Sequence, residues 1–344
     1  MATEFGVTDL QLFVPTLQEG RCLVEIADAT EISVRGRDAG DFLHRLCSAD
    51  LRTIQPGEGL PAFFLDARGR AVALVDIYRL ADGFEIASAP GQSGPILSHL
   101  QRYRIREAVT FEDLSDRRRH YRLFGRGAAS QLQTLFDPSP AEGDAVAGEH
   151  LLRNGGRSGD HGTLSVGGRL VTLRCILRGE LEAFALVCDA ADGDAVLRWM
   201  TERGVVPGPA PLWDAVRIEL GLPDFGRDIG PDCLGPEVSP DPRAISTTKG
   251  CYLGQETVAR LDAHGHLNRR LRGLRVRGEI PPPGTELLLR DKPVGRVTSA
   301  AYSPLRGEGV ALAMIRREAW EPGTVVTWEK GEAVVTDLPM VDSQ

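Results

Sequence analysis

The stretch Lys249–Glu256, which reads K-G-C-Y-L-G-Q-E, places reactive and flexible residue types side by side. Cys251 lies at its centre, Lys249 comes two residues earlier, and a helix-compatible run, Gln255–Leu261, follows directly. If this run is a helix, the thiol lies near its N-terminus, where the helix dipole and the lysine charge stabilise a thiolate. Such a cysteine can act as a nucleophile, a redox group or a metal ligand. The alternative is a small buried hydrophobic residue on a tight glycine turn.

Metal binding is not predicted elsewhere in the chain. The six cysteines are scattered without a C-x-x-C pair, so neither a zinc knuckle nor a cluster motif is present, and free thiols are expected. His264 and His266 are separated by one glycine and invite a metal interpretation. Two imidazoles alone do not complete a ligand set, so we expect them to face solvent and predict no metal site.

Length and charge limit the class of protein. With 344 residues the chain exceeds the range of one growing core, which predicts two or three packed units. The net charge of -8 argues against bulk nucleic-acid binding. No apolar run is long enough for a membrane span, and the first twenty residues carry Glu4, Asp9 and Glu19 where a signal peptide would be basic and then apolar. We therefore expect a cytoplasmic protein that binds neither nucleic acid nor membrane directly.

Two segments of the chain, residues 30–105 and 118–203, repeat one pattern. Each begins with a strand-like run, continues through Gly36-Arg37 or Gly125-Arg126, and then enters a helix whose apolar residues share one face. Further strand signals and a second strand and helix follow in both copies. The repeat predicts a duplicated α+β unit with mainly antiparallel sheets.

The remainder of the chain divides into a crossing segment and a β-rich end. A helix is expected over Leu212–Gly221, followed by a proline-rich segment that delivers Lys249–Glu256 to a cleft between units. Beyond Arg269, short strands alternate with Gly and Pro, which is typical of a small all-β barrel. We therefore predict domain limits of 1–117, 118–268 and 269–344.

Three motifs carry a family resemblance. The runs Ile32–Leu43, Ala215–Gly226 and Lys249–Glu256 together make the whole chain resemble the YgfZ branch of the glycine-cleavage T-protein superfamily, with its tetrahydrofolate-binding aminomethyltransferase fold. The cysteine motif is the one that is similar to YgfZ proteins in particular. The resemblance implies a duplicated folate-binding unit with a C-terminal β-barrel, and tetrahydrofolate in a central cavity between the two halves and the barrel.

The resemblance also identifies a departure from T-proteins, which transfer a one-carbon unit with an acidic residue on the strand after a glycine-turn hairpin. Here that hairpin turn is Asp66–Gly69, and the acidic positions fall on Ala73 and Leu74. Asp76 lies two residues beyond Leu74 on the same strand face, displaced by roughly 7 Å. Because an aliphatic side chain cannot move a proton, aminomethyl transfer needs Asp76 as a displaced acid.

Further folate contacts follow from the resemblance. Trp213 stands where T-proteins have a folate-contacting arginine and is expected to stack on the pterin, and Glu180 and Glu182 approximate a loop glutamate. In the cysteine motif, Tyr252 is expected to wall the cavity, while Gln255 and Glu256 cap the loop or bond the pterin. Arg217 and Arg260 either bind the folate glutamate tail or form structural ion pairs with Glu219 and Asp228.

Three functions remain open from the sequence. The favoured one is a tetrahydrofolate-binding, non-enzymatic factor for iron-sulfur cluster assembly or repair, which resembles YgfZ proteins and would serve assembly or client proteins, including tRNA-modifying enzymes. In it, Lys249 tunes Cys251. The second is a folate-dependent one-carbon transferase using Asp76. The third is a redox or scaffold protein in which Cys251 forms mixed disulfides and the folate pocket is vestigial.

Overall fold

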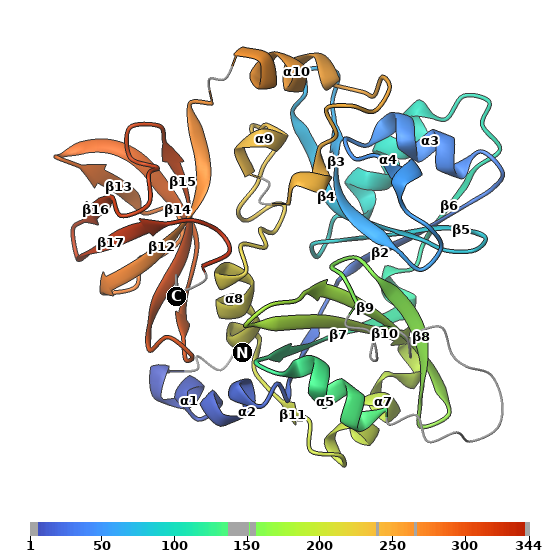
Figure 1. Ribbon diagram of the computed structural model, residues 1–344, viewed down its shortest axis with the longest axis horizontal. Coiled ribbons are helices and arrows are strands. Elements are labelled where there is room, and N and C mark those ends of the chain that lie inside the picture. Colours follow the sequence, from blue (N-terminus) through green and yellow to red (C-terminus); the bar gives the residue numbers. More distant parts are fainter. Residues whose placement is uncertain (1–5, 137–150, 152–155, 239–240, 265–266, 341–344) are drawn as a thin grey trace.

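The protein consists of two sheet-and-helix halves and a β-barrel arranged around a central helix (Figure 1). The computed structural model describes residues 6–136, 151, 156–238, 241–264 and 267–340. Both halves follow the chain order β-α-β-β-β-α-β, which confirms the predicted duplication. In the first half the elements are β2 (Thr30–Arg35), α3 (Ala39–Leu46), β3 (Gly59–Leu65), β4 (Ala71–Arg79), β5 (Gly83–Ser88), α4 (Ser93–Tyr103) and β6 (Thr110–Asp113).

The second half repeats this order with one strand inserted. Its elements are β7 (Arg118–Gly125), α5 (Ala128–Leu135), β8 (His161–Val166), β9 (Arg169–Leu177), β10 (Glu182–Asp189), α7 (Gly193–Thr201) and β11 (Val206–Pro207). The first sheet has the order β3-β4-β5-β2-β6, and the second has β8-β9-β10-β7-β1-β11. Thus β1 (Cys22–Ile26), from the N-terminal end of the chain, lies between the strands that correspond to β2 and β6. The residues predicted as the first half therefore contribute one strand to the second sheet.

The glycines that begin both repeats have a shared structural reason. Gly36 directly follows β2 and has a φ of 122°. Gly125 is the last residue of β7 and has a φ of 133°. A Cβ at Gly36 would lie 2.1 Å from the carbonyl oxygen of Ala108, and one at Gly125 would lie 2.3 Å from that of Leu17. Only glycine tolerates this backbone and this approach, so each half enters its first helix through the same turn.

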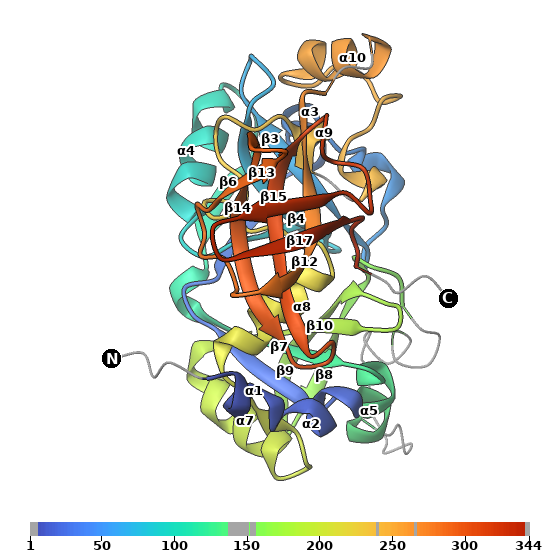
Figure 2. The same ribbon diagram turned by 90° about the vertical axis from the view of Figure 1, so that its left-hand side faces the viewer.

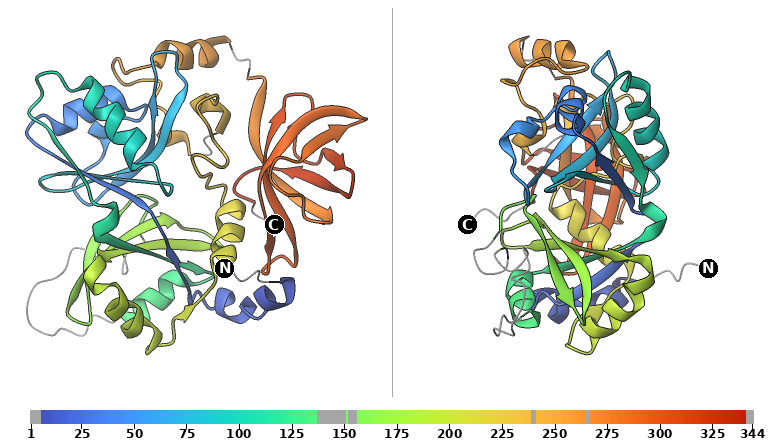
Figure 3. Two further views of the ribbon diagram at one scale, coloured as in Figure 1. Left: turned by 180° about the vertical axis from the view of Figure 1, so that it is seen from behind. Right: turned by 90° about the vertical axis from the view of Figure 1, so that its right-hand side faces the viewer.

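Helices α3 and α4 cover one face of the first sheet, and α5 and α7 cover one face of the second, whose opposite face is covered in part by the helix over residues 210–219. In β4, the buried Ala73, Val75 and Ile77 pack into the core under α3 and α4, and in β7, Tyr121 and Leu123 pack into the core under α5 and α7. Side chains of a strand alternate between faces, so the intervening residues of β4 and β7 point to the opposite faces, here called the inner faces. These two faces meet at the seam between the halves, and the view from behind shows the helices on the outside (Figure 3).

The C-terminal part forms the predicted barrel. Six strands close it in the order β12-β15-β14-β13-β16-β17. They are β12 (Arg269–Gly278), β13 (Glu286–Leu289), β14 (Lys292–Ser303), β15 (Glu308–Arg316), β16 (Val325–Trp328) and β17 (Gly331–Thr336). Figure 2, viewed from the side, shows the barrel in front of the two halves.

Helix α8 (Ala210–Glu219), at the position predicted for Leu212–Gly221, joins the three parts. It packs on β14 and β15 of the barrel and on β1 of the second sheet. Further α-helices in the described ranges are α1 (Val7–Gln11), α2 (Val14–Gln18), α9 (Gly235–Val238) and α10 (Gln255–His264). Within the described ranges, no helix has the length and apolar character needed to cross a membrane.

Candidate functional site

The loop that carries Cys251 is held against the first half by one half-buried ammonium group, that of Lys249. Lys249 Nζ donates to the carbonyl oxygens of His44, Cys47 and Ala49 at 2.5, 2.9 and 2.6 Å. These carbonyls end α3 and the turn after it, where a positive charge also interacts favourably with the helix dipole. The backbone N–H of Leu253 adds a bond to the Arg45 carbonyl oxygen at 3.1 Å. The loop is therefore held against the end of α3.

The choice of lysine at this position is informative. Three of the chain's 40 basic residues are lysines, namely Lys249, Lys292 and Lys330. Three converging carbonyl oxygens match the three donors of one ammonium, whereas the planar guanidinium of arginine presents its donors as a fork. Burial lowers the pKa of Lys249. With its donors engaged by carbonyls, Lys249 anchors the loop, and the predicted tuning of the Cys251 thiol stays a prediction.

Cys251 differs from the other cysteines by its exposure. Its side chain is exposed, while the remaining five cysteines are buried and all six are free thiols. The alternative of a small buried hydrophobic residue is therefore wrong for Cys251. Within the described parts of the chain, no group of three or more His, Cys, Asp or Glu side chains is arranged to hold a metal ion. His266 and the side chain of His264 lie outside the described residues.

The residues that follow Cys251 shape the loop. Tyr252 is buried at 8% exposure in the cluster between the first half and the barrel, and burial raises its pKa to about 12. Gln255 Oε1 accepts a bond from the Tyr252 N–H at 3.1 Å, so Gln255 caps the loop, as one of its two predicted roles requires. Glu256 and Arg260 are exposed on α10.

A charged network joins the two inner faces at the seam. Arg174 of β9 donates two bonds to Glu31 of β2, at 2.8 and 2.7 Å, and one to Glu85 of β5 at 2.7 Å. Its guanidinium also lies 4.3 Å from the ring centre of Tyr78. Burial opposes the charge, but the two carboxylates outweigh it and raise the pKa of Arg174. Arg174 is therefore a cation that pairs with two carboxylates through its terminal nitrogens and joins the halves, while its Nε atom has no partner in the described structure.

Asp76 lies on the same face of β4 as Tyr78, at this seam. Its side chain is exposed to solvent, yet burial among the surrounding protein raises its pKa, against the opposing charges of Arg122 and Arg174. The carboxyl group therefore reaches solvent although protein surrounds it. No hydrogen bond or ion pair holds this carboxylate among the described residues, so a ligand can reach it.

Arg122 of β7 lies at the same seam, on the second sheet. Its guanidinium lies 5.7 Å from the ring centre of Trp213 on α8, which in turn packs against Phe124 at 5.5 Å. Burial lowers the pKa of Arg122. Its Nη1 donates to the Tyr121 carbonyl oxygen of its own strand, and its Nε atom is buried without a partner in the described structure. We define the central recess as the space that Asp76, Arg122 and Trp213 face.

Two other predicted contacts lie elsewhere. Arg217 is 1% exposed and takes the structural alternative: it binds Asp214, Asp228 and Ser299 at 2.9, 2.7 and 2.8 Å. Its guanidinium thus anchors α8 to the barrel and is committed to protein groups. Glu180 forms an ion pair with Arg126 at 2.6 Å and lines a separate hollow of about 320 Å³ beside the barrel.

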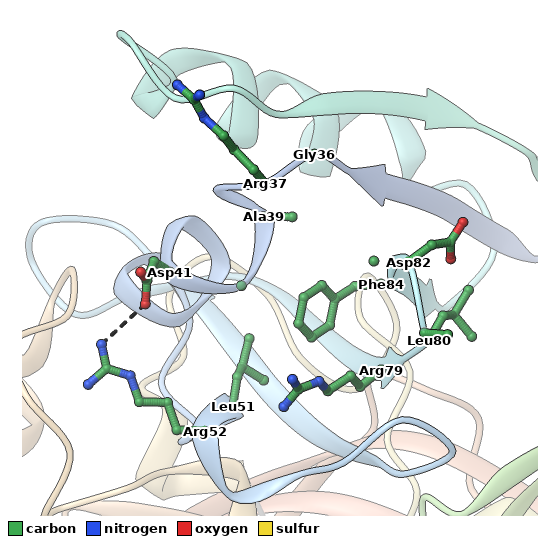
Figure 4. Close-up of a pocket in the computed structure, with 13 residues that line it drawn as sticks. Gly36, Arg37, Ala39, Asp41, Leu51, Arg52, Arg79, Leu80, Asp82 and Phe84 are labelled. Carbon is green, nitrogen blue, oxygen red and sulfur yellow. Dashed lines mark hydrogen bonds and ion pairs between the residues drawn. The ribbon is translucent and has the colours of Figure 1, made fainter.

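A separate surface hollow lies away from Asp76 and Arg122. It has about 600 Å³ and lies between α3 and the turn after β4 (Figure 4). Its charged groups already have partners: Arg52 pairs with Asp41 at 3.2 Å, and Arg79 donates to the Ile54 carbonyl oxygen at 2.7 Å. Arg37 points away from the hollow in Figure 4. We therefore place the candidate site at the seam, where the exposed carboxylate of Asp76 has no hydrogen bond or ion pair within the described chain.

Comparison with known families decides the assignment. Residues 14–234 match the model of the GCVT N-terminal domain, and residues 269–342 match the glycine cleavage T-protein C-terminal barrel domain. The chain belongs to the glycine cleavage T-protein family. Family members bind tetrahydrofolate, so a folate ligand fits this assignment.

Individual relatives agree over nearly the whole chain. An aminomethyltransferase of Thermus thermophilus is 29% identical over 320 residues, covering 92% of this chain and 86% of the relative. One of Halalkalibacterium halodurans is 25% identical, covering 88% and 81%. The crystal structure of aminomethyltransferase T of the glycine cleavage system from Bartonella henselae superposes with a TM-score of 0.77 at 19% identity, over 98% of this chain and 90% of that one. This last likeness supports the T-protein fold alone.

The sequence reasoning missed Arg122 and the network around Arg174. Arg118, His120 and Arg122 alternate along β7, and such a polar alternation normally indicates a solvent-facing side of a strand. The signal for a seam would have been the match of the two repeats, because it places the inner faces opposite each other. Asp76, which the sequence did single out, is close enough to Arg122 for that charge to act on its pKa.

Proposed function

We propose that this T-protein family member binds tetrahydrofolate in the central recess and acts in folate-dependent one-carbon transfer, with Asp76 as the acid-base residue. The observation that carries the proposal is Asp76 itself, an accessible carboxyl group whose pKa burial raises, on the strand where the family resemblance expects an acid. A raised pKa makes its carboxylate a stronger base near neutral pH. The folate, when bound, supplies the amine that receives the one-carbon unit.

The residues around the recess fit a planar, polar ligand. The Trp213 ring offers a surface for an aromatic system, and Asp76 and Arg122 offer an acceptor and a donor without protein partners in the described chain. Asp76 would hold the folate amine and accept its proton, and Trp213 would fix the plane of the pterin. Arg174, Glu31 and Glu85 would keep the two halves at a fixed separation.

The test separates binding from chemistry. Calorimetric titration with 5-formyltetrahydrofolate should show binding to the wild type and to Asp76→Asn. Formation of methylenetetrahydrofolate from an aminomethylated lipoyl carrier should fall by about 100-fold or more in Asp76→Asn, the scale of a lost general base. Asp116→Asn, at an exposed position, is the matched control. Equal turnover by Asp76→Asn and the wild type would remove Asp76 from the mechanism.

A second candidate function rests on the exposed Cys251. We propose that the Lys249–Glu256 loop assigns the chain to the YgfZ branch, and that Cys251 meets an iron-sulfur assembly or client protein. The anchored loop and the single exposed thiol support this role. In cells that lack this protein, Cys251→Ser should then fail to restore activity of cluster enzymes, while its folate affinity equals that of the wild type. Full restoration by Cys251→Ser would reject the accessory role.

A further inference from the structure

Arg122 and Arg174 lie on the same face of the second sheet but differ in whether carboxylates pair with them. The register of the second sheet places Arg122 opposite Ala185, and Ala185 opposite Arg174, so the two guanidinium groups extend from one row across three strands. Arg174 makes three bonds to carboxylates. Arg122 makes none in the described structure: its Nη1 donates to the Tyr121 carbonyl oxygen, and the Nε atoms of both arginines are buried without a partner. A desolvated cation without a counter-ion is unfavourable, and an anion that reached it would relieve this.

The position of Arg122 relative to Asp76 follows from the packing of the two sheets. Arg174 lies over Tyr78, and Asp76 is two residues from Tyr78 along β4, a displacement of roughly 7 Å. Arg122 lies two strands from Arg174, roughly 10 Å across the second sheet. The charges of Arg122 and Asp76 act on each other. Among the charged groups near Asp76, Arg122 has the largest effect, and it lowers the pKa that burial raises. The two residues form no ion pair, so the recess separates an acid from a guanidinium.

This arrangement selects among anions. A guanidinium presents two parallel N–H donors that match a carboxylate, and the Trp213 ring beneath Arg122 helps to hold its plane. A phosphate dianion would bring a second negative charge toward Asp76, which pairs with no cation in the described chain. A carboxylate places a single negative charge at Arg122. Asp76 is then free to bind an amine group of the same ligand.

We propose that Arg122 binds a carboxylate group of a small molecule held in the central recess. The carboxylate has two sources that share this chemistry: the glutamate tail of the folate itself, or a second, amino-acid-like ligand bound beside the folate. The first source rests on the proposed folate function, whereas the second does not require it. In both cases Arg122 sets specificity for an anionic ligand.

The experiment compares probes with and without a carboxylate by calorimetric titration of the full chain. The probes are 5-formyltetrahydrofolate, 5-formyltetrahydropteroate, which lacks the glutamate, N-methylglycine, and its neutral amide. Arg122→Gln should bind the relevant carboxylate probe about 10- to 100-fold more weakly and the matching neutral probe equally. Arg122→Lys should recover part of the loss because it keeps the charge. Arg118→Gln, on the same strand but paired with Asp189 at the surface, is the control.

The outcomes separate the sources. Weaker binding of 5-formyltetrahydrofolate alone assigns the folate tail, and weaker binding of N-methylglycine alone assigns a second ligand. The inference is overturned if Arg122→Gln binds all four probes as the wild type does, or loses the neutral probes to the same extent. If wild type binds neither folate probe but its N-methylglycine binding depends on Arg122, the folate function fails and this inference stands. If the wild type binds folate and Arg122→Gln changes the binding of none of the four probes, the folate function stands and this inference fails.

Discussion

Replacing Lys249 by methionine tests how the Cys251 loop is held in place. The substitution keeps an unbranched side chain of similar size but removes three bonds from an ammonium to the carbonyl oxygens of His44, Cys47 and Ala49. Bonds to charged groups contribute about 1.5–3 kcal/mol each when buried. Lys249 is half-buried, so water can replace part of each bond, and we expect a loss of about 3 kcal/mol for the three together.

Hydrogen exchange gives the direct readout of this loss. The Leu253 amide, which bonds to the Arg45 carbonyl oxygen, reports opening of the loop. A loss of about 3 kcal/mol should speed its exchange by roughly 100-fold, while amides in the barrel are unaffected. Lys292→Met, at an exposed barrel position, is the matched control, and Lys249→Arg should be intermediate because a planar fork cannot meet three converging carbonyls. Unchanged exchange at Leu253 in Lys249→Met would refute the anchoring role.

Three further predictions concern charge and exposure. Arg217→Met removes the partner of the buried Asp228 and should lower the free energy of unfolding by about 3–5 kcal/mol in denaturant titrations. Arg227→Met, at the exposed end of the same network, should lower it by at most about 1 kcal/mol. Similar losses for both variants would contradict the structural role of Arg217. Burial raises the pKa of Asp76 above its unfolded value, so the stability that protonated Asp76 contributes at low pH is lost as pH rises through the folded pKa. Asp76→Asn should therefore raise the Tm at neutral pH, with a difference that vanishes in acid, and a lowered Tm at pH 7 would show that the carboxylate has a partner. Under native conditions a thiol reagent should label one cysteine per chain rapidly and none in Cys251→Ser, whereas fast labelling of the variant would show that a second cysteine is accessible.

Most of the architecture could be read from the sequence because its signals are local. The repeated Gly36-Arg37 and Gly125-Arg126 turns mark positions where only glycine fits, and they located both halves. Alternating strands after Arg269 predicted the barrel, which the structure confirms. The insertion of β1 into the second sheet was not predicted, because pairing of Cys22 with Phe124 and Val206 joins residues far apart in the sequence.

The candidate site was only partly predictable for the same reason. The spacing of Lys249 and Cys251 suggested an electrostatic effect on the thiol, whereas the acceptors of the ammonium lie some 200 residues away at the end of α3. The polar alternation along β7 predicts that Arg122 faces solvent. Its role depends on the packing of the first sheet against the second, which joins residues far apart in the sequence. Asp76 was found because the family resemblance placed an acid on its strand.

A crystal structure of the full chain grown with saturating 5-formyltetrahydrofolate tests the central claim most directly. We predict that the pterin lies in the central recess, over Trp213 and within hydrogen-bonding reach of Asp76. Binding of the folate in the hollow between α3 and the turn after β4, or at any site that Asp76 and Trp213 do not line, would contradict the account.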